Sequence, residues 1–202
     1  MTSTRPGTDS GGGPERVLGV ALEAFGRYGF RKTSMEDVAR SAGVSRQGLY
    51  LRYANKEALF RAAVRQELDA ALDEATQHLN EEGVGLDQRV VAALDAWLGR
   101  YVGSMLASDI SNMLENPAAQ LQDIVEAAIS AFDAQLAAAI AAATSATDRR
   151  RLRVTPEEVA TVLHTVAQGS KYLSRSREEF LARATAATHL VLAGLNTTKE
   201  RR

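Results

Sequence analysis

In the stretch GVSRQGLYLRYANKEALF, residues 43–60, residues that commonly cap helices stand on both sides of a short segment with helical spacing. Gly43 ends a helical pattern, because glycine adopts the left-handed backbone conformation of a helix C-cap at little cost. Ser45 and Asn55 are N-cap residues, since their side-chain oxygens accept hydrogen bonds from backbone N–H groups of the following turn. The stretch therefore predicts a helix that ends at Gly43, a tight turn, a short helix over residues 46–53 and a longer helix that begins with KEALF.

Two further helices are predicted before this stretch. The first begins at Pro14 and ends at Gly29, because proline is favoured at a first helical position and apolar residues follow at helical spacing. The second begins with a capping box, formed either by Thr33 with Glu36 or by Ser34 with Asp37. Its buried face is expected to consist of Met35, Val38 and Ala39.

The second and third predicted helices, joined by a short turn, have the pattern of a helix-turn-helix. A recognition helix presents its N-terminal residues to base edges in the major groove, and here these residues are Arg46 and Gln47. Gly48 permits a close approach, Tyr50 is expected to reach DNA, and Lys56 is expected to hold a phosphate. The pattern alone also fits an ordinary helical hairpin with a solvated polar face.

The segment VLGVALEAFGRYGFRKTSMEDVARSAGVSRQGLYLRYANKEALFRAAV closely resembles the N-terminal DNA-binding region of TetR/AcrR-type bacterial transcriptional regulators. The resemblance lies in AFGRYGF at the end of the first helix, in TSMEDVA, in AGVS, in LY, and in NKEALF. It covers about a quarter of the chain. Many members of the family have histidine and phenylalanine where this chain has Arg52 and Tyr53. Arg52 adds a positive charge to the expected phosphate contacts, and Tyr53 is expected to pack into the small core.

The resemblance implies a homodimer that binds a palindromic double-stranded DNA operator, represses a promoter and releases it when a small-molecule effector binds. It implies an all-α fold with an N-terminal three-helix DNA-binding domain and a C-terminal helical domain for effector binding and dimerisation. The residues that it places at DNA, together with the turn cap, are Ser34, Ser45, Arg46, Gln47, Gly48, Tyr50, Arg52 and Lys56.

The composition is that of an ordinary globular protein, with 45% hydrophobic and 24% charged residues among 202. Cysteine is absent, which excludes disulfides and thiolate metal sites. No apolar run of about 20 residues and no signal-peptide pattern is evident, so a cytoplasmic protein without membrane contact is expected. Residues 1–65 carry 11 Lys or Arg and 6 Asp or Glu. This excess fits a surface that faces a polyanion, and it equally fits chance variation among solvated faces.

The rest of the chain has helical patterns throughout, with about nine helices expected in total. We expect a disordered tail over 1–13, a DNA-binding domain over 14–60 and a helical domain over 61–202. Within the last domain, the patterns predict a helix from Leu86 or Asp87 to about Met105, a short segment near 110–114 and a helix from Asn116. A polar loop follows over TSATDRRRLRVTP, and its RRRLR cluster is expected to be solvated. Helices then follow over about 156–173 and 176–195.

The last two predicted helices have apolar faces that suit a dimer interface, although such faces also suit a monomeric core. They comprise Val159, Val162, Leu163, Val166 and Ala167, and Phe180, Leu181, Ala184, Ala187, Leu190, Val191 and Leu195. Aromatic, methionine and histidine residues of the middle helices are candidates to line an effector pocket, or else belong to the core. These are Trp97, Tyr101, Met105, Met113, Phe132, His164 and Tyr172.

Other functions find little support in the residues. There is no Ser/His/Asp array, no Gly-rich phosphate loop and no spacing of the three histidines that suits a metal, so an enzyme, a cofactor and a metal site are not expected. One alternative stays open: a DNA-binding architectural or cell-division factor of the same fold without an effector. A packed C-terminal domain would favour it, and a cavity would favour the ligand-responsive repressor.

Overall fold

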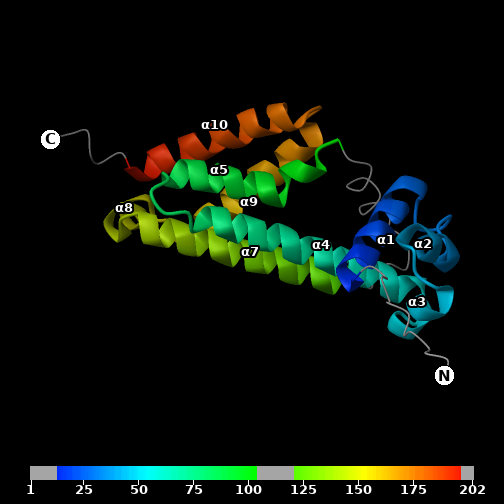
Figure 1. The fold of residues 1–202 in the computed structure, drawn as a ribbon. Helices are drawn as coiled ribbons and strands as arrows, with labels where there is room; N and C mark the ends of the chain where they lie inside the picture. Colours follow the sequence, from blue (N-terminus) through cyan, green and yellow to red (C-terminus); the bar gives the residue numbers. More distant parts are fainter. Residues whose placement is uncertain (1–12, 104–120, 197–202) are drawn as a thin grey trace, which may run out of the picture. The chain divides into compact units, whose positions relative to one another are not determined.

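The computed structural model describes residues 13–103 and 121–196, and every regular element in these ranges is helical. They contain nine α-helices and one short 3₁₀ helix, which confirms the all-α prediction (Figure 1). The chain divides into two compact units, Met1–Glu67 and Leu68–Arg202. Helix α4, Lys56–Leu79, contains the point of division. The domain boundary expected after residue 60 stays a prediction.

The N-terminal unit consists of α1 (Pro14–Tyr28), α2 (Met35–Ala42), α3 (Arg46–Arg52) and the first half of α4. Each helix ends or begins where the sequence predicts. Gly29 caps α1 at a φ of 81°, and Gly43 caps α2 at a φ of 69°, a conformation that other residues rarely adopt. The Asn55 side chain accepts a hydrogen bond from the Ala58 N–H at the start of α4.

Three phenylalanine rings form the centre of this small unit. The rings of Phe25 and Phe60 meet edge to face with centroids 5.0 Å apart, and Phe30 lies 5.5 Å from Phe25. Leu49 of α3 is buried, as are Met35 and Val38 of α2, Val17 and Ala21 of α1, and Leu59, Ala63 and Val64 of α4. Leu49 is the one buried residue of α3 and therefore anchors this helix to the unit.

The C-terminal unit combines the second half of α4 with six further elements. These are α5 (Leu86–Trp97), η1 (Gly99–Tyr101), α7 (Gln122–Ala143), α8 (Ala146–Leu152), α9 (Pro156–Leu173) and α10 (Arg177–Asn196). One core joins α4, α5, α7, α9 and α10, with members that include Ala71 and Ala75 of α4, Leu94 of α5, Leu136 and Ile140 of α7, Leu163 of α9 and Phe180 and Ala184 of α10. Thr155 and Glu158 form a capping box at the start of α9.

One expectation for this unit is wrong. The helix predicted to run to about Met105 ends at Trp97 and continues as η1. Gly99 lies there because a Cβ at this position would overlap the Asp95 carboxylate, which accepts two hydrogen bonds from Arg177 at 2.9 and 2.6 Å. The Asp95 hydrogen bond raises the pKa of Arg177. The predicted segment near 110–114 and the predicted helix start at Asn116 lie outside the described residues.

The predicted polar loop after α7 contains the short helix α8. Ser145 caps its N-terminus, and Arg153 ends it in the left-handed conformation. Arg149, expected to be solvated, instead donates hydrogen bonds of 2.5 Å to both the Thr144 carbonyl and the Thr144 hydroxyl. These bonds satisfy the Thr144 carbonyl at the C-terminal end of α7, where carbonyl groups lack partners within the helix. The prediction that the arginine cluster is solvated is therefore wrong for Arg149.

Helix α7 is long and apolar enough to cross a membrane by length and composition, although the sequence analysis found no such run. Its apolar residues have another use here. Phe132, Leu136, Ala137 and Ile140 belong to the buried core of the unit, and Ile124 is also buried. One face of the helix therefore packs in the core, and 33% of its apolar stretch is buried.

The two faces predicted for dimerisation are split by the structure. Val159, Leu163 and Ala167 of α9, and Phe180, Ala184 and Leu195 of α10, are buried within the chain itself. They cannot contact a second copy. Val162 and Val166 of α9 and Leu190 of α10 are exposed instead, with Leu190 at 77%. The helical repeat explains why buried and exposed residues alternate along α9 and α10. Residues four positions apart lie on the same face of a helix, whereas adjacent residues do not.

Candidate nucleic-acid interface

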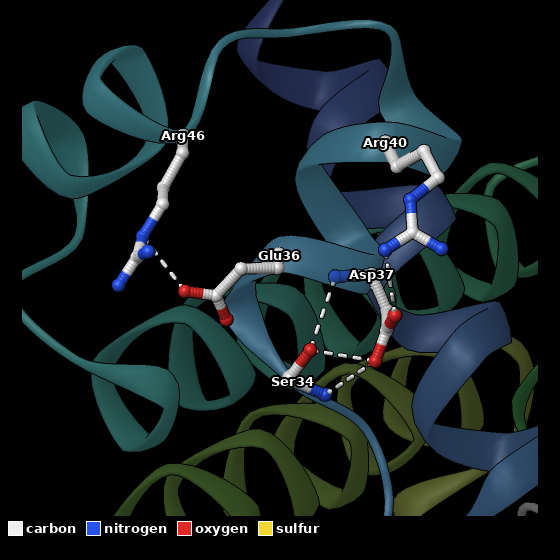
Figure 2. A network of polar contacts seen from close by, with 5 residues as sticks. All are labelled: Ser34, Glu36, Asp37, Arg40 and Arg46. Atoms are coloured by element: carbon white, nitrogen blue, oxygen red, sulfur yellow. Dashed lines mark hydrogen bonds and ion pairs between the residues drawn. The ribbon is translucent and has the colours of Figure 1, made fainter.

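The start of α2 is held by reciprocal hydrogen bonds between Ser34 and Asp37. The Ser34 hydroxyl accepts from the Asp37 N–H at 3.1 Å, and the Asp37 carboxylate accepts from the Ser34 N–H at 3.2 Å and from the Ser34 hydroxyl at 2.6 Å. Figure 2 shows this network with the neighbouring charged side chains. Of the two capping boxes that the spacing allowed, the Ser34 pair is the one formed. Thr33 is buried and donates to backbone carbonyls instead.

The turn between α2 and α3 is short because both of its ends are capped. Gly43 ends α2, and the Ser45 hydroxyl accepts a hydrogen bond of 2.9 Å from the Gly48 N–H. A Cβ at residue 48 would lie 3.0 Å from the same Ser45 oxygen. Gly48 therefore keeps the cap uncrowded, and Ser45 has a local role as a cap in addition to any contact with DNA.

Arg46 occupies the exposed N-terminus of α3 and contacts groups on two sides. Its Nε lies 2.7 Å from Oε1 of Glu36, so that an ion pair joins the first turns of α2 and α3 (Figure 2). Its guanidinium carbon lies 5.5 Å from the centre of the Tyr50 ring. The Arg46 side chain is nevertheless 66% exposed. It is thus oriented by neighbours and remains open to a ligand.

The other predicted contacts of α3 are exposed in the same short helix. Gln47, Tyr50 and Arg52 are all exposed, whereas Leu49 between them is buried. Tyr53, expected in the core, is half-buried at the end of the helix. The described geometry therefore presents one arginine, one amide and one phenol from the same helix, which are groups that donate to base edges and phosphates.

Lys56 at the start of α4 is already engaged by the protein. Its Nζ donates a 2.8 Å hydrogen bond to the Phe30 carbonyl and lies 4.3 Å from the centre of the Phe30 ring. These contacts tie the first turn of α4 to the segment between α1 and α2. An ammonium has three donors, so the remaining ones can still serve the predicted phosphate contact.

Comparison with known proteins places this geometry in a family. Residues 17–63 match the sequence family described as "Bacterial regulatory proteins, tetR family". The matched residues include α2, the capped turn and α3. This segment of the chain therefore matches the TetR family. Among relatives, the match to the HTH-type regulator YezE of Bacillus subtilis is 37% identical over 67 residues, 33% of this chain and 34% of YezE. The match to RutR of Escherichia coli is 43% identical over 53 residues, 26% of this chain and 25% of RutR.

The matches thus span about a third or less of the curated relatives' length. Similarity of fold extends over nearly the whole chain. A transcriptional regulator from Rhodococcus sp. Rha1 superposes with a TM-score of 0.70 over 91% of this chain and 97% of its own, at 17% identity. At that identity the likeness concerns the fold alone.

Sequence reasoning missed two charged residues of this surface. Glu36 was considered only as a possible capping partner of Thr33, and it pairs with Arg46 instead. Arg40, 78% exposed, lies 3.4 Å from Asp37 at the helical spacing of three residues. That spacing was a local signal for the second pair. No local signal predicts the first, because it depends on how the turn folds α3 back onto α2.

The Ser34 hydroxyl is expected to control the acidity of Asp37. Its hydrogen bond is the largest cause that lowers the pKa of Asp37, followed by the Ser34 N–H. A carboxyl with a lowered folded-state pKa stabilises the fold above its unfolded pKa, and this contribution is lost as the pH falls through the folded value. Ser34→Ala should raise the pKa of Asp37 in an NMR titration, whereas Ser34→Thr should keep it low. An unchanged pKa in Ser34→Ala would contradict this account.

In the C-terminal unit, three of the predicted effector contacts come together. The Trp97 ring stacks on Phe132 with centroids 5.0 Å apart, and its Nε1–H donates to Nε2 of His164 at 3.2 Å. His164 Nδ1 lies 2.6 Å from the Asp133 carboxylate. Because Nε2 accepts from Trp97, the neutral ring carries its proton on Nδ1 and donates it to Asp133. Trp97, Phe132 and His164 are all buried.

The remaining predicted effector contacts do not join this cluster. Tyr172 is 61% exposed near the end of α9, and its contact with an effector stays a prediction. Tyr101 is half-buried in η1. Met105 and Met113 lie outside the described residues. Within residues 13–103 and 121–196, no three His, Asp or Glu side chains come together to hold a metal ion.

Proposed function

We propose that this TetR-family chain is a transcriptional regulator that reads a palindromic operator as a homodimer. One observation carries the proposal: α3 presents the exposed side chains of Arg46 and Gln47 at its capped N-terminus while Leu49 anchors it to the unit. Arginine donates two hydrogen bonds to guanine O6 and N7, and glutamine pairs with adenine N6 and N7. Exposed donors on a firmly seated helix suit the reading of bases.

Phosphate contacts would come from the residues around this helix. Tyr50 and Arg52 are exposed on α3, and Lys56 lies in the first turn of α4. Contacts of this kind set the register of a protein on DNA and make its affinity depend on salt. Repression of a promoter follows if the bound site overlaps it.

Selection of bound sequences from a random duplex library tests the proposal. We expect enrichment of two inverted half-sites, whose centres lie about 34–36 Å apart or a multiple of that spacing. Binding should then be measured at two salt concentrations with the selected duplex. Recovery of no preferred sequence, with binding that simply disappears in high salt, would contradict the proposal and favour an architectural DNA-binding factor.

The homodimer is proposed to form through the exposed apolar residues of α9 and α10. Val162, Val166 and Leu190 are exposed on two helices that pack against each other. Val166→Glu would bury an unpaired charge in such an interface, so the dimer dissociation constant should rise on the order of 100-fold or more. Sedimentation velocity measures this change.

Leu152→Glu provides the matched control, since Leu152 is an apolar residue of α8 that is 40% exposed. It introduces the same charge on α8, outside the exposed apolar residues of α9 and α10, and should leave the dimer intact. A Val166→Glu protein that remains as dimeric as the wild type would exclude this interface.

Release from DNA by a small-molecule effector is proposed to act through the Trp97 cluster. A ligand that enters between Trp97 and Phe132 must separate their stacked rings and compete for the His164 hydrogen bonds. Trp97 is the only tryptophan of the chain, so its fluorescence reports such an event directly. Compounds that shift Trp97 emission should weaken operator binding by about 5- to 150-fold, the usual range of allosteric coupling.

A DNA-binding factor of the same fold without an effector is the second candidate. The close packing of Trp97, Phe132 and His164 favours it, because none of these residues is more than 7% exposed. A broad compound screen distinguishes the two candidates. If no compound that shifts Trp97 emission changes operator affinity, the effector-free factor is the better description.

A further inference from the structure

The position of Arg46 is determined by an acidic residue on the neighbouring helix. Glu36 lies in the first turn of α2 and pairs through Oε1 with Nε of Arg46 at 2.7 Å. Tyr50, one helical turn after Arg46, places its ring 5.5 Å from the guanidinium carbon. Figure 2 shows the Arg46 side chain extending from α3 toward Glu36. A long, exposed side chain is thus held between a carboxylate and an aromatic face.

The atom that Glu36 contacts decides which part of the guanidinium is left open. The group is planar, with one N–H on Nε and two on each terminal nitrogen, so its donors lie along distinct edges. Glu36 occupies Nε, at the side of the group. The terminal edge, formed by Nη1 and Nη2, keeps two parallel donors. Guanine presents two adjacent acceptors, O6 and N7, in the major groove, and adenine presents an acceptor beside a donor.

The neighbouring carboxylate does not compete for this role. Asp37 accepts hydrogen bonds from the Ser34 N–H and hydroxyl, and it lies 3.4 Å from Arg40. The two consecutive acidic residues therefore have different roles. Asp37 takes part in the N-cap of α2, and Glu36 pairs with Arg46 of α3. An acidic side chain beside a surface that meets DNA is costly by charge alone, so its presence calls for a compensating role.

We propose that Glu36 is a specificity-determining positioning residue that holds Arg46 so that its terminal edge meets guanine. The proposal rests on the proposed reading of DNA by α3. Without Glu36, Arg46 is released to contact phosphates as well as bases, and such contacts carry no sequence information. Glu36 therefore lowers affinity for DNA in general while raising the preference for one base.

The test compares sequences selected from a random duplex library by the wild type and by four variants. Arg46→Ala identifies the half-site position that Arg46 reads, because preference there disappears. Glu36→Ala should retain the other positions of the half-site and lose guanine preference at this one, by on the order of 10-fold. Glu36→Gln should keep part of the preference, since its amide oxygen still accepts from Nε. Glu23→Ala removes an equal charge from an exposed site on α1 and should change nothing.

A second measurement tests the geometry at the base itself. Replacing the guanine at the identified position by 7-deazaguanine removes the N7 acceptor. This change should weaken binding of the wild type and of Glu23→Ala, and should have little effect on Arg46→Ala and Glu36→Ala. Thermal unfolding followed by circular dichroism, together with the retained half-site positions, shows that Glu36→Ala is folded.

Each outcome has a distinct meaning. If the wild type selects no sequence, the proposed function itself fails. If it selects half-sites in which Arg46 does not read guanine, or if Glu36→Ala keeps the full guanine preference, the role of Glu36 is overturned and the proposed function stands. Loss of the preference in Glu36→Ala, with partial rescue in Glu36→Gln, supports the role of Glu36.

Discussion

Phe25→Ala is expected to unfold the N-terminal unit under conditions in which the wild-type protein is folded. The Phe25 side chain is fully buried and lies against the rings of both Phe30 and Phe60. Truncation of a buried phenylalanine to alanine costs about 3–5 kcal/mol. Whole domains have unfolding free energies of about 5–15 kcal/mol, and small ones lie near the lower end. DNA binding should therefore be lost together with the fold.

Urea unfolding followed by circular dichroism measures this effect. Tyr28→Ala is the matched control, because Tyr28 is an aromatic residue of the same helix that is 57% exposed. Its removal should change the unfolding free energy by less than about 0.5 kcal/mol. Equal losses of stability in the two variants would mean that the phenylalanine cluster is not the core of this unit.

His164→Leu is expected to destabilise the C-terminal unit by about 2–4 kcal/mol, because it leaves two polar groups without partners. The Trp97 N–H would lose its buried acceptor, and the Asp133 carboxylate would lose the donor 2.6 Å away. Leucine supplies similar volume but neither hydrogen bond. Trp97 fluorescence during urea unfolding reports directly on this unit.

His189→Leu distinguishes the loss of hydrogen bonds in a core from the loss of a histidine as such. His189 also faces an aspartate on another helix, at 3.3 Å from Asp87, but its side chain is 58% exposed. Exposed ion pairs contribute about 1 kcal/mol at most, so His189→Leu should be nearly neutral. If both variants lose the same free energy of unfolding, the hydrogen bonds of His164 to Trp97 and Asp133 do not stabilise the C-terminal unit more than an exposed histidine contact does.

Local chemistry accounts for the parts of the fold that could be predicted. Helix ends at Gly29 and Gly43, and the caps at Ser45 and Thr155, depend on residues within four positions of each other. The exposed Arg46 and Gln47 followed from their place just after the Ser45 cap. These features need no knowledge of tertiary structure.

Contacts between distant residues account for most of what could not be predicted. Glu36 pairs with Arg46, Lys56 with the Phe30 carbonyl, and Trp97 with His164, at sequence separations from 10 to 67. Apolar periodicity locates a helix face but does not say whether it meets the chain itself or a second copy. Hence Leu163 and Val166, both expected at a dimer interface, have opposite environments.

The ratio of the dissociation constants for the selected duplex and for a shuffled duplex of equal length and composition tests the central claim most directly. Both dissociation constants are measured by fluorescence anisotropy at one physiological salt concentration. The selected duplex should bind at least on the order of 1,000-fold more tightly than the shuffled duplex. Arg46→Ala should reduce this ratio on the order of 10-fold or more, mainly by weakening binding to the selected duplex. A ratio near one for the wild type would contradict the account, because α3 would then contact phosphates without reading bases.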